Sequence, residues 1–213
     1  VLTEEDKGYW GNLPNIAVIP NANTFVTDQI ALLENKKVIA VGRYTYQKGF
    51  ERLIKAWKML ASQFPDWKLD IIGEGEGHEA LQKLIDSYRL GQQVTLVHPT
   101  QQIERVYRNA SLLVLSSRYE GLPMVLLEAQ AFGLPIVAFA CKCGPRDIVS
   151  DQETGILVAE GDIEGLAKGM STVMENETLR KQMGVKAKAV SLRYDEDVIM
   201  KKWMDLFHQL TTK

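Results

Sequence analysis

The sequence predicts an α/β fold, a doubly wound, Rossmann-like parallel sheet of about six strands with helices on both faces. Short apolar runs of four or five residues alternate with longer amphipathic stretches through most of the chain. Such alternation is typical of crossover units, in which each helix returns the chain to begin the next parallel strand. Right-handed crossovers place these helices on both faces of the sheet.

The individual elements follow from the hydrophobic period. Apolar runs predict strands over 38–41, 69–72, 94–97, 112–115, 135–139 and 155–158. Apolar residues recur at three- and four-residue spacing between and after these runs, which is the period of a helix. They predict helices over about 48–63, 80–88, 101–108, 123–132, 162–174, 176–192 and 195–210.

Composition excludes several classes of protein. The 213 residues are 46% hydrophobic and 24% charged, with a formal net charge of −2, as expected of a folded globular domain and not of a disordered chain. No block of like charge suggests a nucleic-acid or membrane surface. The two cysteines cannot form a disulfide framework, so we expect a cytoplasmic protein. The chain opens on Val1 and has no signal peptide or membrane-spanning run, and we expect it to be a fragment.

The loop after the first main strand carries two cations. It reads Gly42-Arg43-Tyr44-Thr45-Tyr46-Gln47-Lys48-Gly49, and ligands of such sheets bind at the carboxyl ends of the strands. A guanidinium and an ammonium suit phosphate oxygens, and glycines let the backbone approach a ligand. On spacing alone, an ordinary surface loop with solvated cations explains the pattern equally well.

The loop after the fourth strand leads into a helix that begins at Pro123. Proline fits the first helical turn, where its missing N–H costs nothing. The free amides there, together with the helix dipole, form an anion site. Glu120 precedes this helix, and Glu128 lies inside it among apolar neighbours. A carboxylate in that setting needs donors, which sugar hydroxyls, an arginine or a backbone amide would supply.

Taken together, these motifs resemble the retaining family 4 glycosyltransferases of the GT-B fold. The resemblance rests on Gly42-Arg43 with Lys48-Gly49, on Glu120 and Glu128, and on the segment from Gly144 to Val149 closed by Thr154 to Val158. It extends over roughly 16–210, and the ordered set of motifs is more specific than any one of them. The family's Gly-Gly is replaced by Cys143-Gly144, which departs from the pattern near the sugar.

The resemblance implies a role for each matched residue. Arg43 and Lys48 would hold the donor's diphosphate, Glu120 would face the donor sugar, and these three would act in catalysis. Glu128 would hold the ribose. The remaining contacts to the nucleotide would come from Gly42, Glu74, Pro99, Gly121, Leu122, Pro123, Met124 and Val125.

The implied function is transfer of a sugar from a nucleotide diphosphate sugar, with uridine favoured over guanosine, to a glycan or lipid-linked acceptor. No cofactor or metal is expected, because fixed cations would stabilise the leaving diphosphate. No nucleic-acid partner is expected, and contact of the full-length protein with the inner face of the membrane is left open.

The implied organisation has three parts. Residues 1–35 would be an interdomain lead-in that includes a first strand, at Ile16–Ile19, and 36–193 the nucleotide-sugar-binding domain. Residues 194–213 would form a C-terminal helix. Its apolar stripe, Ile199, Trp203, Leu206, Phe207 and Leu210, is interpreted mainly as core, with bracing of a missing acceptor domain as the alternative.

Other functions remain as alternatives. A non-catalytic nucleotide-sugar-binding module would need the same residues, and an epimerase or a phosphorylase shares the architecture. The sequence lacks the additional catalytic groups of those two enzymes and the glycine fingerprint of a dehydrogenase. The acidic Asp195–Asp197 is interpreted as the start of a helix rather than a metal site. Cys141 and Cys143 are interpreted as buried or incidental thiols, and His78, His98 and His208 as scattered surface or loop residues.

Overall fold

A computed structural model of the chain describes residues 1–212 and contains one parallel sheet. The strand order is β3-β2-β1-β4-β5-β6, and every neighbouring pair is parallel. The strands are β1 (Lys37–Val41), β2 (Lys68–Ile72), β3 (Val94–Val97), β4 (Leu112–Leu115), β5 (Ile136–Phe139) and β6 (Gly155–Val158). The predicted six-stranded, doubly wound sheet is therefore confirmed, with each strand within a residue or so of its expected bounds.

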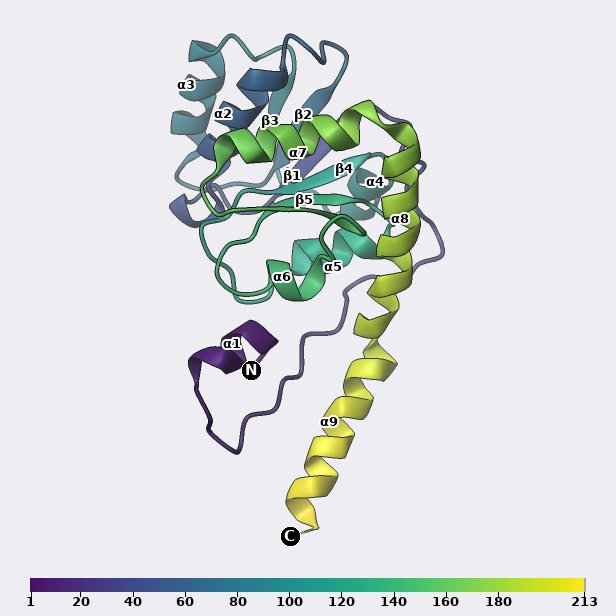
Figure 1. The fold of residues 1–213 in the computed structure, drawn as a ribbon. Coiled ribbons are helices and arrows are strands. Elements are labelled where there is room, and N and C mark those ends of the chain that lie inside the picture. Colours follow the sequence, from purple (N-terminus) through teal and green to yellow (C-terminus); the bar gives the residue numbers. More distant parts are fainter. Residues whose placement is uncertain (213) are drawn as a thin grey trace.

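Of the nine helices in residues 1–212, seven lie where the apolar period predicts them, and the apolar period did not predict the short helices over 4–9 and 145–148 (Figure 1). They are α1 (Glu4–Tyr9), α2 (Phe50–Leu60), α3 (His78–Ser87), α4 (Ile103–Arg108), α5 (Met124–Ala131), α6 (Pro145–Ile148), α7 (Ile163–Glu175), α8 (Glu177–Ser191) and α9 (Glu196–Thr211). Two short 3-10 turns, Tyr46–Lys48 and Leu192–Tyr194, complete the pattern.

Two apolar cores sandwich the sheet. One face packs against α2, α3 and α7 around the fully buried Trp57. The other face packs against α4 and α5 and against lead-in residues such as Leu33, with Phe132 at its centre. Successive strand residues contribute to opposite cores, as Val38 and Ile39 do, which explains why both faces of these strands are apolar.

The expected strand in residues 1–35 is wrong. The run Ile16–Ile19 forms no strand, although its backbone makes two hydrogen bonds of 3.0 Å, from the Val1 ammonium to the Ala17 carbonyl and from the Ile19 N–H to the Val1 carbonyl. A strand needs a ladder of partners on a neighbouring strand. The segment reaches only Val1, so the ladder stops after one residue.

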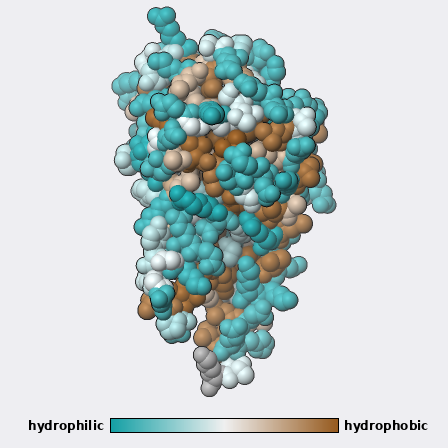
Figure 2. All heavy atoms as spheres, in the orientation of Figure 1, coloured by the Kyte–Doolittle hydropathy of each residue, from teal (hydrophilic) through white to brown (hydrophobic). Residues whose placement is uncertain are grey.

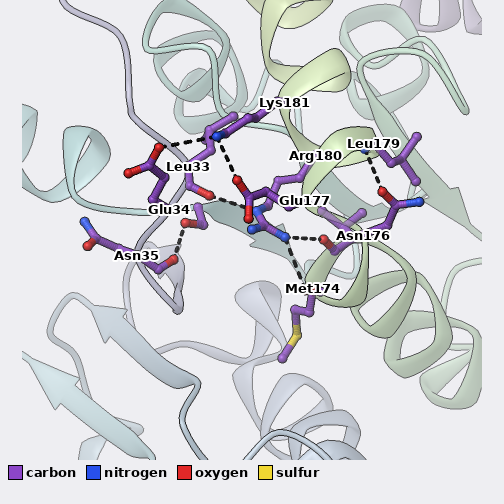
Figure 3. Close-up of polar contacts among 11 residues, drawn as sticks. Leu33, Glu34, Asn35, Met174, Asn176, Glu177, Leu179, Arg180 and Lys181 are labelled. Atoms are coloured by element: carbon purple, nitrogen blue, oxygen red, sulfur yellow. Dashed lines mark hydrogen bonds and ion pairs between the residues drawn. The ribbon is translucent and has the colours of Figure 1, made fainter.

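A buried arginine ties the lead-in to the helical layer (Figure 3). Arg180 of α8 is 5% exposed and donates hydrogen bonds to the carbonyl oxygens of Leu33, Val173 and Met174. Its neighbour Lys181 forms ion pairs with Glu34 and Glu177 at the surface. The same turn of α8 thus fastens the end of α7 and the segment that enters β1.

Helix α9 extends away from the sheet and runs beside the lead-in segment (Figure 1). Only Ile199 of its stripe is buried, whereas Trp203, Phe207 and Leu210 are 39%, 54% and 64% exposed. The interpretation of this stripe as core is therefore wrong for Trp203, Phe207 and Leu210, whereas Leu206 is half-buried.

The exposed part of α9 faces a groove that it shares with the lead-in. The groove has a volume of about 710 Å³ and is lined mainly by apolar residues, among them Pro14, Ile16, Trp203, Leu206 and Leu210. Brown, apolar atoms gather in this lower part of the molecule in Figure 2. Within residues 1–212, no helix is both long enough and apolar enough to cross a bilayer.

Candidate functional site

The loops that carry the predicted site residues meet at one edge of the sheet. Because all strands are parallel, the segments after β1, β2, β3, β4 and β5 leave from the same edge. The strand order reverses between β1, which leads to β2 on one side, and β4, which lies on the other. Sheets of this kind bind ligands in the crevice at this reversal, outside the carboxyl ends of the strands. The two loops that the sequence singles out, after β1 and after β4, begin on either side of this reversal.

Lys48 and Glu120 meet at this reversal. The Lys48 Nζ atom lies 2.7 Å from Oε1 of Glu120, and the two side chains are only 16% and 7% exposed. The Ser117 hydroxyl donates to the same oxygen at 2.6 Å. The Lys48 stem crosses Gly42, where an added Cβ would lie 3.1 Å from the Lys48 Cε atom. The structure therefore pairs the predicted phosphate-binding cation with the predicted sugar-binding carboxylate.

The backbones of the two loops are also joined. The Arg118 N–H donates to the Gln47 carbonyl at 2.8 Å, and the Ser116 hydroxyl donates to the Lys48 carbonyl at 2.9 Å. The Arg118 guanidinium lies 3.7 Å from the centroid of the Tyr46 ring. These contacts hold the ion pair in place from both sides. Arg43, the second predicted cation, is exposed, and its side chain makes no hydrogen bond or ion pair with the described residues 1–212.

Helix α5 begins beside the ion pair with unpaired amides. The N–H groups of Leu122, Met124 and Val125 make no hydrogen bond within residues 1–212, and such amides attract anions at a helix start. Pro123 was expected within the first turn but is the residue before it, with φ −71° and ψ 94°. Its extended ψ explains why the helix starts one residue later.

The segment after β5 forms the neighbouring wall. The Glu120 N–H donates to the Lys142 carbonyl at 2.9 Å. Cys143 has a φ of +61° and Gly144 a φ of +98°, so both lie in the left-handed region that favours glycine. A Cβ on Gly144 would lie 2.3 Å from Cδ of Pro123. The backbone thus keeps a glycine-like path at both positions, although cysteine replaces the first glycine.

Glu128 has a hydrogen-bond partner that the sequence did not predict. It lies half-buried on α5, and the Tyr107 hydroxyl of α4 donates to its Oε2 atom at 2.5 Å. Tyr107 is fully buried. Burial, together with the charge of Glu128, raises the pKa of this phenol well above its ordinary value. The partner is therefore neither the arginine nor the backbone amide considered as alternatives.

The residues expected near the base lie farther out. Glu74 and Pro99 are both exposed at the ends of β2 and β3. The Glu74 carbonyl accepts the Tyr44 N–H at 2.7 Å, which fastens this loop to the loop after β1. His78 and His98 were expected to be scattered, but their rings stack with centroids 6.3 Å apart.

The interpretations of the remaining features can be compared with the structure. Cys141 and Cys143 are free and buried, and burial raises the pKa of the Cys141 thiol to about 12. Asp195 precedes α9, as expected, but its side chain makes no capping hydrogen bond. No cluster of three potential metal ligands occurs among residues 1–212.

Sequence reasoning missed two residues of the site, Ser117 and Tyr107. Ser117 stands three residues before Glu120 in the same loop, a spacing that could have suggested a hydroxyl-to-carboxylate contact. Tyr107 comes from a different helix, and its contact with Glu128 depends on how α4 and α5 pack together.

Two bacterial proteins are similar to this chain in sequence over nearly its whole length. The chain is 38% identical over 206 residues to an uncharacterized glycosyltransferase of Haemophilus influenzae, covering 95% of this chain and 58% of that protein. It is 37% identical to the amylovoran biosynthesis glycosyltransferase AmsD of Erwinia amylovora, covering 98% of this chain and 61% of the relative. The chain thus spans about three fifths of these relatives.

A solved glycosyltransferase structure has the same fold as this chain. An S. aureus TarM mutant in complex with fondaparinux, α-GlcNAc-glycerol and UDP superposes with a TM-score of 0.89 at 27% identity, over 97% of this chain and 43% of that one. The six-stranded sheet is thus one half of the GT-B architecture. The family model described as glycosyl transferases group 1 matches residues 25–190. The chain therefore belongs to the group 1 glycosyl transferases.

Proposed function

We propose that this chain is the donor-binding part of a retaining glycosyltransferase that uses a nucleotide diphosphate sugar, with UDP as the carrier. The observation that carries the proposal is the meeting of Lys48, Glu120 and the free amides of α5 at the strand reversal. A cation beside a helix start suits a diphosphate. UDP is present in the TarM complex, whose chain is 27% identical to this one.

In this proposal, the diphosphate lies between Lys48 and the start of α5. An ammonium group has three N–H donors, and Glu120 takes one of those of Lys48, so two remain for phosphate oxygens. Arg43, exposed at the same edge, adds a second positive charge. Breaking the bond between the sugar and the phosphate leaves negative charge on the diphosphate, and preorganised cations and amides stabilise that charge. A divalent metal ion is then unnecessary.

The two acidic residues bind the parts of the donor on either side of the phosphates. Glu120 accepts hydroxyl donors of the sugar and orients it, and Glu128 accepts the ribose hydroxyls. The acceptor hydroxyl attacks the sugar carbon on the face from which the diphosphate leaves and passes its proton to the departing phosphate oxygen, so that configuration is retained. The acceptor, a glycan or a lipid-linked glycan, would be held by another part of the protein, and the apolar stripe of α9 would brace that part.

A calorimetric titration with uridine, UMP, UDP and a panel of UDP- and GDP-sugars tests the proposal. We expect affinity to rise steeply from UMP to UDP, to be higher for uridine than for guanosine nucleotides, and to be unchanged by EDTA. Equal affinity for uridine and UDP would contradict a diphosphate site, and loss of UDP binding in EDTA would contradict the metal-free mechanism.

A further inference from the structure

Tyr107 combines two properties that are not usual for a core aromatic. Its ring is fully buried and stacks on Phe132 with centroids 5.4 Å apart and an angle of 9°, and Phe25 meets it edge-on at 6.2 Å. This apolar cage fixes the ring. Yet its hydroxyl donates to a carboxylate oxygen of the proposed nucleotide site, Oε2 of Glu128. The phenol therefore connects the core between α4 and α5 to the site.

The contact makes the two carboxylate oxygens of Glu128 different in their hydrogen bonding. Oε2 accepts the Tyr107 hydroxyl, whereas Oε1 accepts no hydrogen bond from residues 1–212. An ionised carboxylate can accept on both oxygens. Because burial and the nearby carboxylate raise the pKa of the phenol well above its ordinary value, the hydroxyl keeps its proton and remains a donor throughout the physiological pH range. Within residues 1–212, a hydrogen bond thus holds the Glu128 carboxylate at Oε2 and leaves Oε1 available to a ligand.

We infer that Tyr107 is a positioning residue for ribose recognition: it holds Oε2 of Glu128 so that Oε1 is ready to accept the vicinal hydroxyls of a ribonucleotide. The inference rests on the proposed function, in which Glu128 binds the ribose. It extends that function by assigning ribose selectivity to a hydroxyl that never touches the ligand. A carboxylate already held in one orientation loses less conformational entropy when it binds.

A purely structural role makes a different prediction. If the hydroxyl served only to satisfy Glu128 within the fold, its removal would lower stability and leave ribose selectivity unchanged. The two roles are separated by the ratio of affinities for UDP and for 2′,3′-dideoxyuridine diphosphate, which lacks both donors. A folding defect lowers the apparent affinity for both nucleotides by the same factor, so it does not change this ratio.

The test is calorimetry on the Tyr107→Phe variant, which keeps the ring and deletes one oxygen. Tyr194→Phe is the matched control, since Tyr194 is also buried and donates one hydrogen bond, at 3.2 Å to the Asp147 carbonyl. For Tyr107→Phe we expect about a tenfold loss of UDP affinity, the size expected for a hydrogen bond to a charged group, and little change for the dideoxy analogue. In a Glu128→Gln background, Tyr107→Phe should add no further loss.

Each outcome decides one point. An unchanged ratio in Tyr107→Phe, with the wild type preferring UDP, overturns the inference and leaves the proposed function standing. No preference for UDP in the wild type removes the proposed role of Glu128 itself. If Tyr107→Phe is largely unfolded, both titrations are repeated in the osmolyte TMAO, which favours the folded state, and an unchanged ratio there also overturns the inference.

Discussion

Replacing Lys48 with alanine is the perturbation whose effect the structure defines best. The ammonium is 2.7 Å from Glu120, and the side chain is only 16% exposed, so solvent screens it weakly. In our proposal it donates at least one charge-assisted hydrogen bond to the diphosphate, which contributes about 1.5–3 kcal/mol. Since about 1.4 kcal/mol corresponds to a factor of ten, UDP affinity should fall roughly 10- to 100-fold.

The size of this loss depends on what alanine leaves behind. Without Lys48, the Glu120 carboxylate keeps only the Ser117 hydroxyl as a donor and repels the incoming diphosphate. We therefore expect a loss toward the upper end of the range. Uridine carries no phosphate and therefore makes no hydrogen bond to Lys48 in our proposal. Its affinity should change by less than about twofold.

Calorimetry with UDP and uridine measures both values. Lys37→Ala is the matched control, because Lys37 pairs with Asp70 at 2.6 Å but lies at the start of β1, at the opposite edge of the sheet. It should leave both affinities unchanged. Equal losses of uridine and UDP affinity in Lys48→Ala would refute a phosphate role for this residue.

Three further predictions each concern a single residue. Glu120→Gln removes the negative charge beside Lys48, so UDP should bind as well as or more tightly than in the wild type, whereas a UDP-sugar should lose its affinity advantage over UDP in the same titration. Arg180→Met leaves three buried carbonyls without their donor; urea unfolding should show a loss of about 3 kcal/mol or more, with UDP affinity retained. Burial raises the pKa of the Cys141 thiol to about 12, so ionisation favours the unfolded chain above its ordinary pKa; the free energy of unfolding should fall between pH 9 and pH 12, and less so in Cys141→Ala.

The sheet could be predicted from the sequence because strands buried on both faces are continuous apolar runs. Val94–Val97 and Leu112–Leu115 have the same bounds in the sequence pattern and in the structure. The run Ile16–Ile19 has the same apolar character and still forms no strand, since strand formation also requires a partner. The interpretation of the α9 stripe as core was wrong for a related reason. The helical period predicts which residues share a face, but it does not predict which element packs against that face.

The site could be predicted in part. Parallel topology brings the ends of β1 and β4 to one edge, so a pattern of strands was enough to place Lys48 near Glu120. It was not enough to predict their ion pair, which depends on how the two loops cross. The contact of the Tyr107 hydroxyl could not be predicted for the same reason, whereas the three-residue spacing of Ser117 and Glu120 could have suggested theirs. The contact between Tyr107 and Glu128 is set by the packing of α4 against α5, which has no periodic signal in the sequence.

A crystal structure of the chain with UDP tests the central claim most directly. Our account predicts the β-phosphate within hydrogen-bond distance of Lys48 Nζ and of the Met124 or Val125 amide, with a ribose hydroxyl on Oε1 of Glu128. A diphosphate bound away from the start of α5, with the ammonium of Lys48 making no phosphate contact, would contradict it.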